Sequence, residues 1–284
     1  MRSSRSSWRP GSGDHVDAAL HARVSGSGNC AIALLHGLTA SNAVWGADFD
    51  VLAEACRVVI PDLLGFGSSP RPAGGYDADS HALAVEQTLA ELAAPSPIVV
   101  AGHSLGALIA LRLAARRPEL IAGVVAIAPP VYRSGADARH RIGGLGPFAR
   151  TFALDTRWAR VACRVMCHAR PVAARLAAAL QPGRPAELAR ASVEHSWPSY
   201  SQTLQRVVLD GPARSDLVTC SVPVSILVGD HDRVVDLDFL RELSGTPARF
   251  ELDVVVGGEH DLLFSAPDRC VDAIRAMSAS WPSR

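Results

Sequence analysis

The residue with the clearest chemical potential in this sequence is Ser104, which stands in the segment Gly102-His103-Ser104-Leu105-Gly106. A run of apolar, mostly β-branched residues precedes the segment, and an apolar stretch without Gly or Pro follows it. This pattern predicts a strand, a tight turn and a helix. Glycines on both sides leave room for a sharp backbone turn, so we expect the serine hydroxyl to be exposed there as a nucleophile.

The same turn predicts a binding site for negative charge at the start of the helix. Leu105 is expected to be the first helical residue. Amide groups at a helix N-terminus have no partner within the helix, and the helix dipole favours an anion there. The N–H of Leu105 is therefore a candidate donor to the oxyanion that forms when a serine attacks a carbonyl. A serine hydroxyl also needs a base, and the base needs an orienting acid.

Five segments, in this order along the chain, together resemble the α/β-hydrolase superfamily. They are Leu34–Leu38, Pro61–Ser69, Gly102–Gly106, Gly229–Asp232 and Gly257–His260. The resemblance extends from about residue 15 to the end of the chain. It implies an α/β-hydrolase fold, in which a mostly parallel, doubly wound sheet is flanked by helices and the working residues follow the carboxyl ends of the strands.

The resemblance also implies the other members of a catalytic site. The family's chain order of serine, acid and histidine selects His260 as the general base. The family's spacing after Gly229 selects Asp232 as the acid, with Asp230 as the competing carboxylate. The second oxyanion donor is expected to be the backbone N–H of Leu38, the residue after the His-Gly pair.

Three further polar residues near the expected site are interpreted as structural. His103 is adjacent to the serine, but side chains alternate along a strand, so its ring is expected to point away from the hydroxyl. The resemblance suggests that His36 braces the loop after its strand. Asp62 begins a glycine-rich loop and is expected to accept hydrogen bonds from turn amides.

The implied reaction is hydrolysis of a carboxylic ester in a small-molecule substrate, through an acyl-enzyme on Ser104. It requires neither a metal nor an organic cofactor. Serine at the nucleophile position disfavours the epoxide-hydrolase and haloalkane-dehalogenase branches, which use aspartate. Carbon–carbon bond hydrolases and cofactor-free haloperoxidases or perhydrolases share the same triad and remain open. A non-catalytic, receptor-like binding protein of the same fold is an alternative of a different class.

Apolar runs alternate with amphipathic segments along most of the chain, which is typical of a parallel sheet with crossover helices. Predicted strands are residues 15–24 at an edge, 31–35, 57–60, 97–101, 121–128, 222–228 and 249–256. Predicted helices include 45–54, 79–94, the segment that starts at 105, 236–243 and 267–280. In the helix that Asp79 and Ser80 are expected to cap, Glu86 and Glu91 are placed on the polar side.

The alternation of strand and helix breaks down between residues 131 and 219, where the resemblance places a helical cap or lid. The expected domains are a disordered Ser- and Arg-rich tail at 1–13, a core at 14–130 and 220–284, and the cap at 131–219. Candidate substrate contacts are Trp45, Trp158 and Met166. The cap residues among them belong to an apolar stripe of Phe148, Phe152, Trp158, Val161, Val165 and Met166, a pattern also typical of packing against the core.

Composition excludes several classes of protein. The formal net charge is zero, so we expect no nucleic-acid partner. No apolar run approaches the roughly 18 to 20 residues that span a bilayer, and we expect a cytoplasmic protein with no membrane span. The six cysteines have no spacing typical of a disulfide framework or a zinc site, so free thiols in a reducing compartment are expected.

Overall fold

The computed structural model describes residues 19–153, 157–169, 171–172, 174–175, 179, 188, 191–246 and 250–279. The side chains at 148, 152–153 and 166–168 are not among those described. The predicted tail at 1–13 therefore lies outside the described residues. Within them, no helix has both the length and the apolar composition that crossing a membrane requires.

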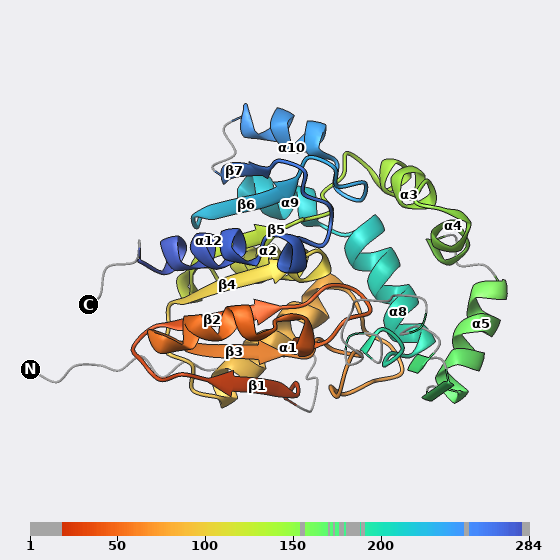
Figure 1. Ribbon diagram of the computed structural model, residues 1–284, viewed down its shortest axis with the longest axis horizontal. Helices are drawn as coiled ribbons and strands as arrows, with labels where there is room; N and C mark the ends of the chain where they lie inside the picture. Colours follow the sequence, from red (N-terminus) through yellow and green to blue (C-terminus); the bar gives the residue numbers. More distant parts are fainter. Residues whose placement is uncertain are drawn as a thin grey trace, which may run out of the picture.

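A seven-stranded sheet in the order β1-β3-β2-β4-β5-β6-β7 forms the centre of the molecule (Figure 1). Its strands are β1 (Ala22–Ser25), β2 (Ala31–Leu35), β3 (Arg57–Pro61), β4 (Ile98–His103), β5 (Ile121–Ile127), β6 (Val224–Gly229) and β7 (Phe250–Val255). Only β1 runs antiparallel to its neighbour; the other adjacent pairs are parallel. The doubly wound, mostly parallel α/β-hydrolase fold expected from the sequence is thus confirmed.

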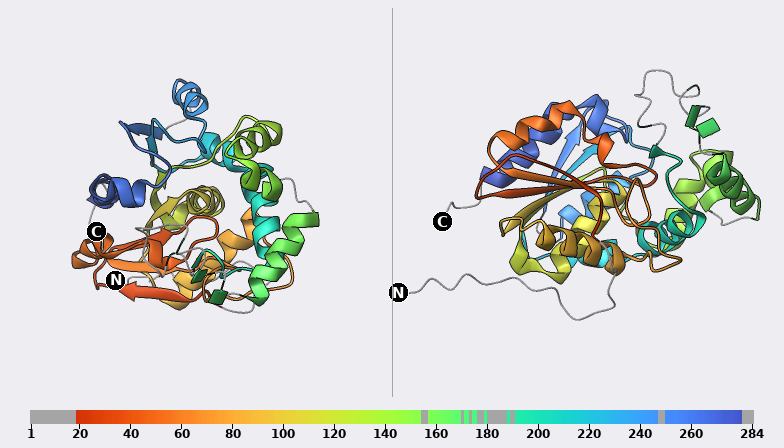
Figure 2. Two further views of the ribbon diagram at one scale, coloured as in Figure 1. Left: turned by 45° about the vertical axis from the view of Figure 1, so that its right-hand side comes forward. Right: turned by 90° about the horizontal axis from the view of Figure 1, so that it is seen from below.

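Helices cover both faces of the sheet, which explains why its central strands are continuous apolar runs. On one face lie α1 (Ala78–Glu91) and α2 (Leu105–Arg116); on the other lie the 3-10 helix η2 (Ala47–Glu54) and α12 (Pro267–Ala279). The right-hand view of Figure 2 shows these two layers with the sheet between them. Side chains alternate between the two cores, since Leu35 joins the cluster under α2 and Leu34 the cluster under α12.

The remaining helices are short, and most of them lie between β5 and β6. They are η1 (Asn42–Val44), η3 (Pro118–Leu120), α3 (Gly135–Gly143), α4 (Pro147–Ala153), α5 (Arg157–His168), α8 (Trp197–Thr203), the π-helix η4 (Leu204–Leu209), α9 (Ala213–Thr219), α10 (Leu237–Ser244) and α11 (Leu262–Ser265). In Figure 1, α3, α4, α5 and α8 stand beyond the carboxyl ends of the strands. By contrast, η4 and α9 contribute to the main core and pack against α2.

The first long helix differs from its prediction at the N-terminus and on its polar face. It begins at Ala78, because Asp77 is the cap and accepts a hydrogen bond from the N–H of Ser80 at 2.9 Å. The expected exposure of Glu86 is wrong, since its side chain is only 1% exposed and pairs with Arg117, the residue that ends α2. Packing of α2 on α1 covers that face, and the arginine compensates the buried carboxylate.

The expectation that every cysteine is a free thiol is also wrong, because Cys30 and Cys56 form a disulfide. The cause is the sheet register: Ala31 and Arg57 are partners in the parallel pair of β2 and β3. The residues just before them are therefore neighbours, with Cα atoms 4.9 Å apart. Sequence spacing could not reveal this pairing, since the two cysteines are separated by 26 positions. Among the described residues, Cys163, Cys220 and Cys270 are not in disulfide bonds.

Candidate active site

The turn between β4 and α2 holds Ser104 in a strained backbone conformation, with φ at 52° and ψ at −115°. The two flanking glycines are needed because the backbone passes close to itself. A Cβ on Gly102 would lie 2.2 Å from the carbonyl carbon of Gly106, and one on Gly106 would lie 2.2 Å from the carbonyl oxygen of Leu35. The chain therefore forms the sharp strand-to-helix turn that the sequence predicts.

A chain of two hydrogen bonds connects the three predicted triad residues. The ring Nε2 of His260 lies 3.0 Å from the hydroxyl oxygen of Ser104, and its Nδ1 lies 2.8 Å from Oδ2 of Asp232. A carboxylate only accepts, so Nδ1 carries the proton and Nε2 accepts from the serine hydroxyl. Asp232 lies 28 positions before His260 in the sequence, and Ser104 lies 156 positions before it. The three residues meet because each follows the carboxyl end of a strand.

The carboxylate of Asp232 is kept ionised by its neighbours. Burial of the side chain opposes ionisation, but hydrogen bonds from His260 and from the N–H groups of Val234 and Val235 outweigh it, so the pKa is lowered. The two amides donate to Oδ1 at 2.7 and 3.0 Å, which leaves Oδ2 for the imidazole. This arrangement fixes both the position and the charge of the carboxylate.

The competing carboxylate, Asp230, does not face the imidazole. It lies on the exposed side of the same loop and accepts a hydrogen bond from the N–H of Gly257 at 2.7 Å. This bond ties the loop after β6 to the turn after β7, which carries His260. Asp230 therefore braces the turn, and the structure brings Asp232 alone of the two to the histidine.

The two backbone segments that carry the predicted oxyanion donors lie next to Ser104. Leu105 is the first residue of α2, where the N–H has no partner within the helix. Leu38 lies in the loop after β2, and this loop passes directly over the serine: a Cβ on Gly37 would lie 3.5 Å from the Cβ of Ser104. A carbonyl oxygen bound between these two backbone segments would be close to the serine hydroxyl.

His36 holds the loop that carries Leu38. Its Nδ1 donates to the carbonyl oxygen of Gly37 at 2.8 Å, and its Nε2 accepts from the N–H of Leu63 at 2.8 Å. The ring is fully buried, and burial lowers its pKa, so it is neutral. The Gly37 carbonyl belongs to the same planar peptide group as the N–H of Leu38. The histidine therefore fixes the direction of a predicted oxyanion donor.

His103 and Asp62 also make structural hydrogen bonds. The Nε2 of His103 donates to the carbonyl oxygen of His260 at 2.9 Å, and burial lowers the pKa of His103 to about 3, so its ring is neutral. Asp62 accepts from the N–H groups of Asn42 at 2.7 Å and Ser68 at 2.9 Å. The bond from His103 holds the backbone at His260, and the two bonds to Asp62 hold the loops that contain Asn42 and Ser68.

The structure does not support the predicted substrate contacts. Trp45 is fully buried in the core under α12, with its ring 4.8 Å from that of Phe49, because the chain turns inward after β2. Trp158 projects from α5 into solvent and is 79% exposed, so it does not line an enclosed pocket. Met166 belongs to α5, and its side chain lies outside the described residues.

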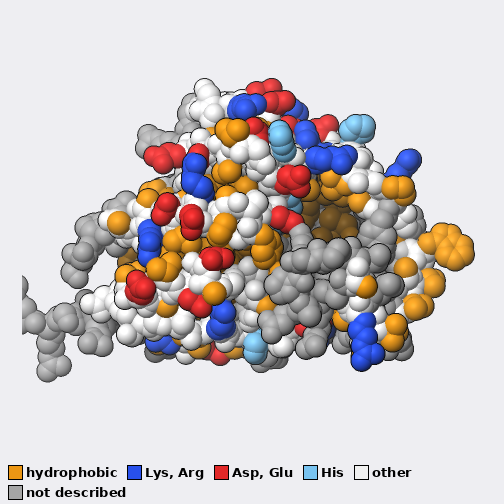
Figure 3. Space-filling view, viewed as in Figure 1, with side chains coloured by type: hydrophobic (Ala, Val, Ile, Leu, Met, Phe, Trp, Pro, Cys, Tyr) orange, Lys and Arg blue, Asp and Glu red, His pale blue; other side chains and the backbone are white. Residues whose placement is uncertain are grey.

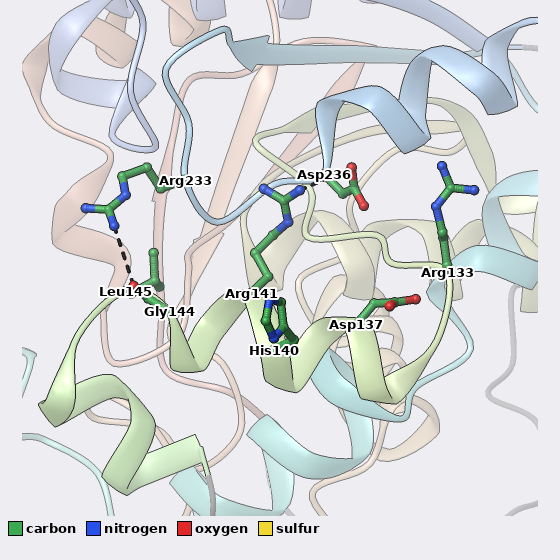
Figure 4. A pocket seen from close by; sticks show the side chains of 8 residues that line it. All are labelled: Arg133, Asp137, His140, Arg141, Gly144, Leu145, Arg233 and Asp236. Carbon is green, nitrogen blue, oxygen red and sulfur yellow. Dashed lines mark hydrogen bonds and ion pairs between the residues drawn. The ribbon is translucent and has the colours of Figure 1, made fainter.

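The loop of Asp232 is also held by two residues that the sequence analysis did not identify. The buried hydroxyl of Tyr132 donates to the carbonyl oxygen of Val234 at 3.0 Å. Arg141 donates to the carbonyl oxygen of Val235 at 3.2 Å and pairs with Asp236 at 3.3 Å. Figure 4 shows Arg141 reaching from α3 toward this loop, in a surface pocket of about 370 Å³. Neither residue stands in a motif, so only the fold reveals their role.

Comparison with known proteins identifies the family. A model of the Alpha/beta hydrolase family matches residues 32–273. The chain belongs to this family of enzymes. Among curated relatives, this hydrolase is 28% identical over 268 residues to 2-(acetamidomethylene)succinate hydrolase from Mesorhizobium japonicum, with 90% of each chain covered. It is 27% identical over 256 residues to probable lysophospholipase BODYGUARD 5 from Arabidopsis thaliana, covering 81% of its own length but only 57% of that protein's.

Solved structures share the fold of this hydrolase over nearly its whole length. The crystal structure of E-2-(acetamidomethylene)succinate hydrolase matches with a TM-score of 0.70 and 23% identity, over 92% of this chain and 95% of the other. The enol-lactonase from Burkholderia xenovorans matches with a TM-score of 0.70 and 20% identity, over 92% and 96% of the two chains. Identities at this level show the fold alone.

Proposed function

We propose that this hydrolase cleaves a carboxylic ester, or a related acyl bond, in a small molecule by forming an acyl-enzyme on Ser104. His260 is the general base, Asp232 is the orienting acid, and the N–H groups of Leu38 and Leu105 form the oxyanion hole. The observation that carries the proposal is the hydrogen-bond chain from Asp232 through His260 to the serine hydroxyl.

The reaction proceeds in two acyl-transfer steps. His260 Nε2 takes the hydroxyl proton as the serine oxygen attacks the substrate carbonyl, and the two backbone amides stabilise the oxyanion. His260 then returns the proton to the departing alcohol as the carbon–oxygen bond breaks. Water attacks the acyl-enzyme by the same route and gives its proton to His260, which protonates Ser104 as the acid leaves. Ionised Asp232 stabilises the imidazolium in both steps.

Two observations favour a small-molecule substrate. The relative that aligns over 90% of both chains is named for the hydrolysis of a small succinate derivative. The relative named as a probable lysophospholipase is much longer, and this chain spans 57% of it. A hydrolase of small substrates therefore fits the whole chain better than the activity of the longer protein.

We also propose that the segment 131–219 carries a helical cap that selects the substrate, with α3, α4, α5 and α8 in the cap and η4 and α9 in the core beneath it. The proposed triad residues follow the carboxyl ends of β4, β6 and β7, and α3, α4, α5 and α8 stand beyond that same edge of the sheet (Figure 1). Half-buried Trp197 in α8 is a test position, with exposed Trp158 as its matched control. Trp197→Ala should change the kcat/KM ratio between short and long esters by about tenfold or more, and Trp158→Ala should not. An equal fall for all esters would make the segment a stability element.

Covalent labelling and a substrate panel test the catalytic proposal. A fluorophosphonate probe should label the wild type at Ser104 and leave Ser104→Ala unlabelled, since an unactivated serine does not react. Turnover of p-nitrophenyl esters by Ser104→Ala should fall by about 10⁴ or more, with an unchanged circular dichroism spectrum. Retention of more than about a hundredth of the activity would refute the assignment.

The same panel separates the alternatives. Turnover of a vinylogous 1,5-diketone without ester turnover would indicate a carbon–carbon bond hydrolase. Formation of peracetic acid from acetate and hydrogen peroxide, without ester turnover, would indicate a perhydrolase. A folded wild type that neither labels nor turns over any substrate would indicate a binding protein.

A further inference from the structure

Helix α5 has an unusual distribution of side chains. Its buried positions carry small residues, Ala159 and Cys163, which are both fully buried. Three large apolar residues face solvent instead: Trp158 is 79% exposed, Val161 53% and Val165 61%. Their spacing of three and four residues places them on one face of the helix. Figure 3 shows hydrophobic side chains projecting at the right-hand edge, where Figure 1 shows α5.

A row of arginines runs beside this apolar stripe. Each residue of the stripe is directly preceded by an arginine, namely Arg157, Arg160 and Arg164. Consecutive residues of a helix are about 100° apart, so the arginines form a parallel row beside the stripe. All three side chains are exposed, and α5 contains no acidic residue. The whole segment 131–219 holds thirteen arginines against six acids, although the net charge of the chain is zero. On α5 itself, positive charge thus lies directly beside the exposed apolar face.

We propose that this face of α5 docks on an anionic lipid surface. Trp158, Val161 and Val165 enter the boundary between headgroups and acyl chains, while the arginines beside them contact the lipid phosphates. A helix with an apolar stripe flanked by arginines is the arrangement that binds in the plane of such an interface. Tryptophan suits that depth because its ring is apolar and its N–H is polar.

Other occupants of this face fit less well. A second copy paired about a two-fold axis would bring two rows of arginines together, and like charges in contact are unfavourable. A nucleic acid would contact the arginines but would leave the stripe of Trp158, Val161 and Val165 against a charged backbone. An anionic bilayer offers both an apolar layer and negative charge. The proposal does not depend on the catalytic assignment, since no step of docking uses Ser104.

Vesicle flotation of the full chain tests the proposal. The Ser104→Ala variant is used throughout, so that no lipid is hydrolysed. It should float with phosphatidylglycerol vesicles and not with phosphatidylcholine vesicles at low salt. Trp158→Ala should weaken binding by about tenfold, because it removes the largest inserted side chain. Arg157→Gln should weaken binding by about fivefold, and 0.5 M salt should have a larger effect.

Matched control variants come from surfaces away from α5. Val24→Ala, at an exposed position of β1, and Arg275→Gln, on α12, should bind as the parent does. Equal binding to both lipids, no binding to phosphatidylglycerol, or equal losses in the control variants would overturn the proposal. So would a dimer in sedimentation velocity that Trp158→Ala dissociates, because that result would assign the face to a second copy.

Discussion

A pair of substitutions at His36 separates the two functions of its ring. The side-chain nitrogen of asparagine lies at the δ position, as does Nδ1, and the polar end of glutamine lies at the ε position, as does Nε2. His36→Asn should therefore keep the hydrogen bond to the Gly37 carbonyl and lose the acceptor for Leu63. His36→Gln should keep the acceptor for Leu63 and lose the donor to Gly37.

The expected magnitudes follow from what each bond holds. Without its donor, the peptide between Gly37 and Leu38 is free to rotate, and an oxyanion donor contributes about 3 kcal/mol to the transition state. His36→Gln should lower kcat by about 10- to 100-fold and change KM by less than about threefold, because the interaction strengthens in the transition state. His36→Asn leaves the N–H of Leu63 buried without an acceptor, which should cost about 1 to 3 kcal/mol of stability.

Steady-state kinetics on a p-nitrophenyl ester and urea denaturation of both variants measure the catalytic and the structural effect separately. The expected pattern is a kinetic defect in His36→Gln with the smaller loss of stability, and the reverse in His36→Asn. Equal loss of kcat in the two variants would refute the idea that the bond to Gly37 positions the amide of Leu38. Normal kcat in His36→Gln would refute it as well.

Three more outcomes are expected. Asp232→Asn should lower kcat by about 10⁴ in the ester assay, while Asp230→Asn should lower it by less than about tenfold; the opposite order would transfer the role to Asp230. Tyr132→Phe should lower kcat by about three- to tenfold at unchanged fluorophosphonate stoichiometry, because the loop of Asp232 loses a hydrogen bond. Burial lowers the pKa of His81 and of His103 to about 3, so protonation favours the unfolded state below about pH 6.5. In urea denaturation, each of the two histidines should make the free energy of unfolding about 2 kcal/mol lower at pH 5 than at pH 8. His81→Gln should reduce this pH dependence.

The three residues of the proposed triad could be predicted because motif and topology act together. Ser104, Asp232 and His260 each follow a strand, and parallel strands end at the same edge of the sheet. Once those strands are recognised, the three loops must meet. The preference for Asp232 over Asp230 required the family's spacing, and the structure gives the physical reason: turn amides bind one oxygen of Asp232 and direct the other to the imidazole.

Side-chain direction outside the motifs was not predictable. Trp45 and Trp158 are both aromatic residues that were expected to contact the substrate, yet one is fully buried and the other is 79% exposed. Periodicity in α5 identified an apolar stripe but gave no indication of which face packs on the protein. Burial of Ala159 and Cys163 shows that the small residues face inward. The disulfide of Cys30 depended in the same way on strand register, which a sequence does not specify.

The histidines around Ser104 show how partners rather than position in sequence assign a role. His103 is adjacent to the serine, yet its ring donates to a backbone carbonyl, as does the ring of His36. Burial lowers the pKa of both rings, which favours their neutral form. Only His260 bonds to both a hydroxyl and an ionised carboxylate. Of these three rings, it alone has a partner that gives up a proton and another that stabilises the charge that results.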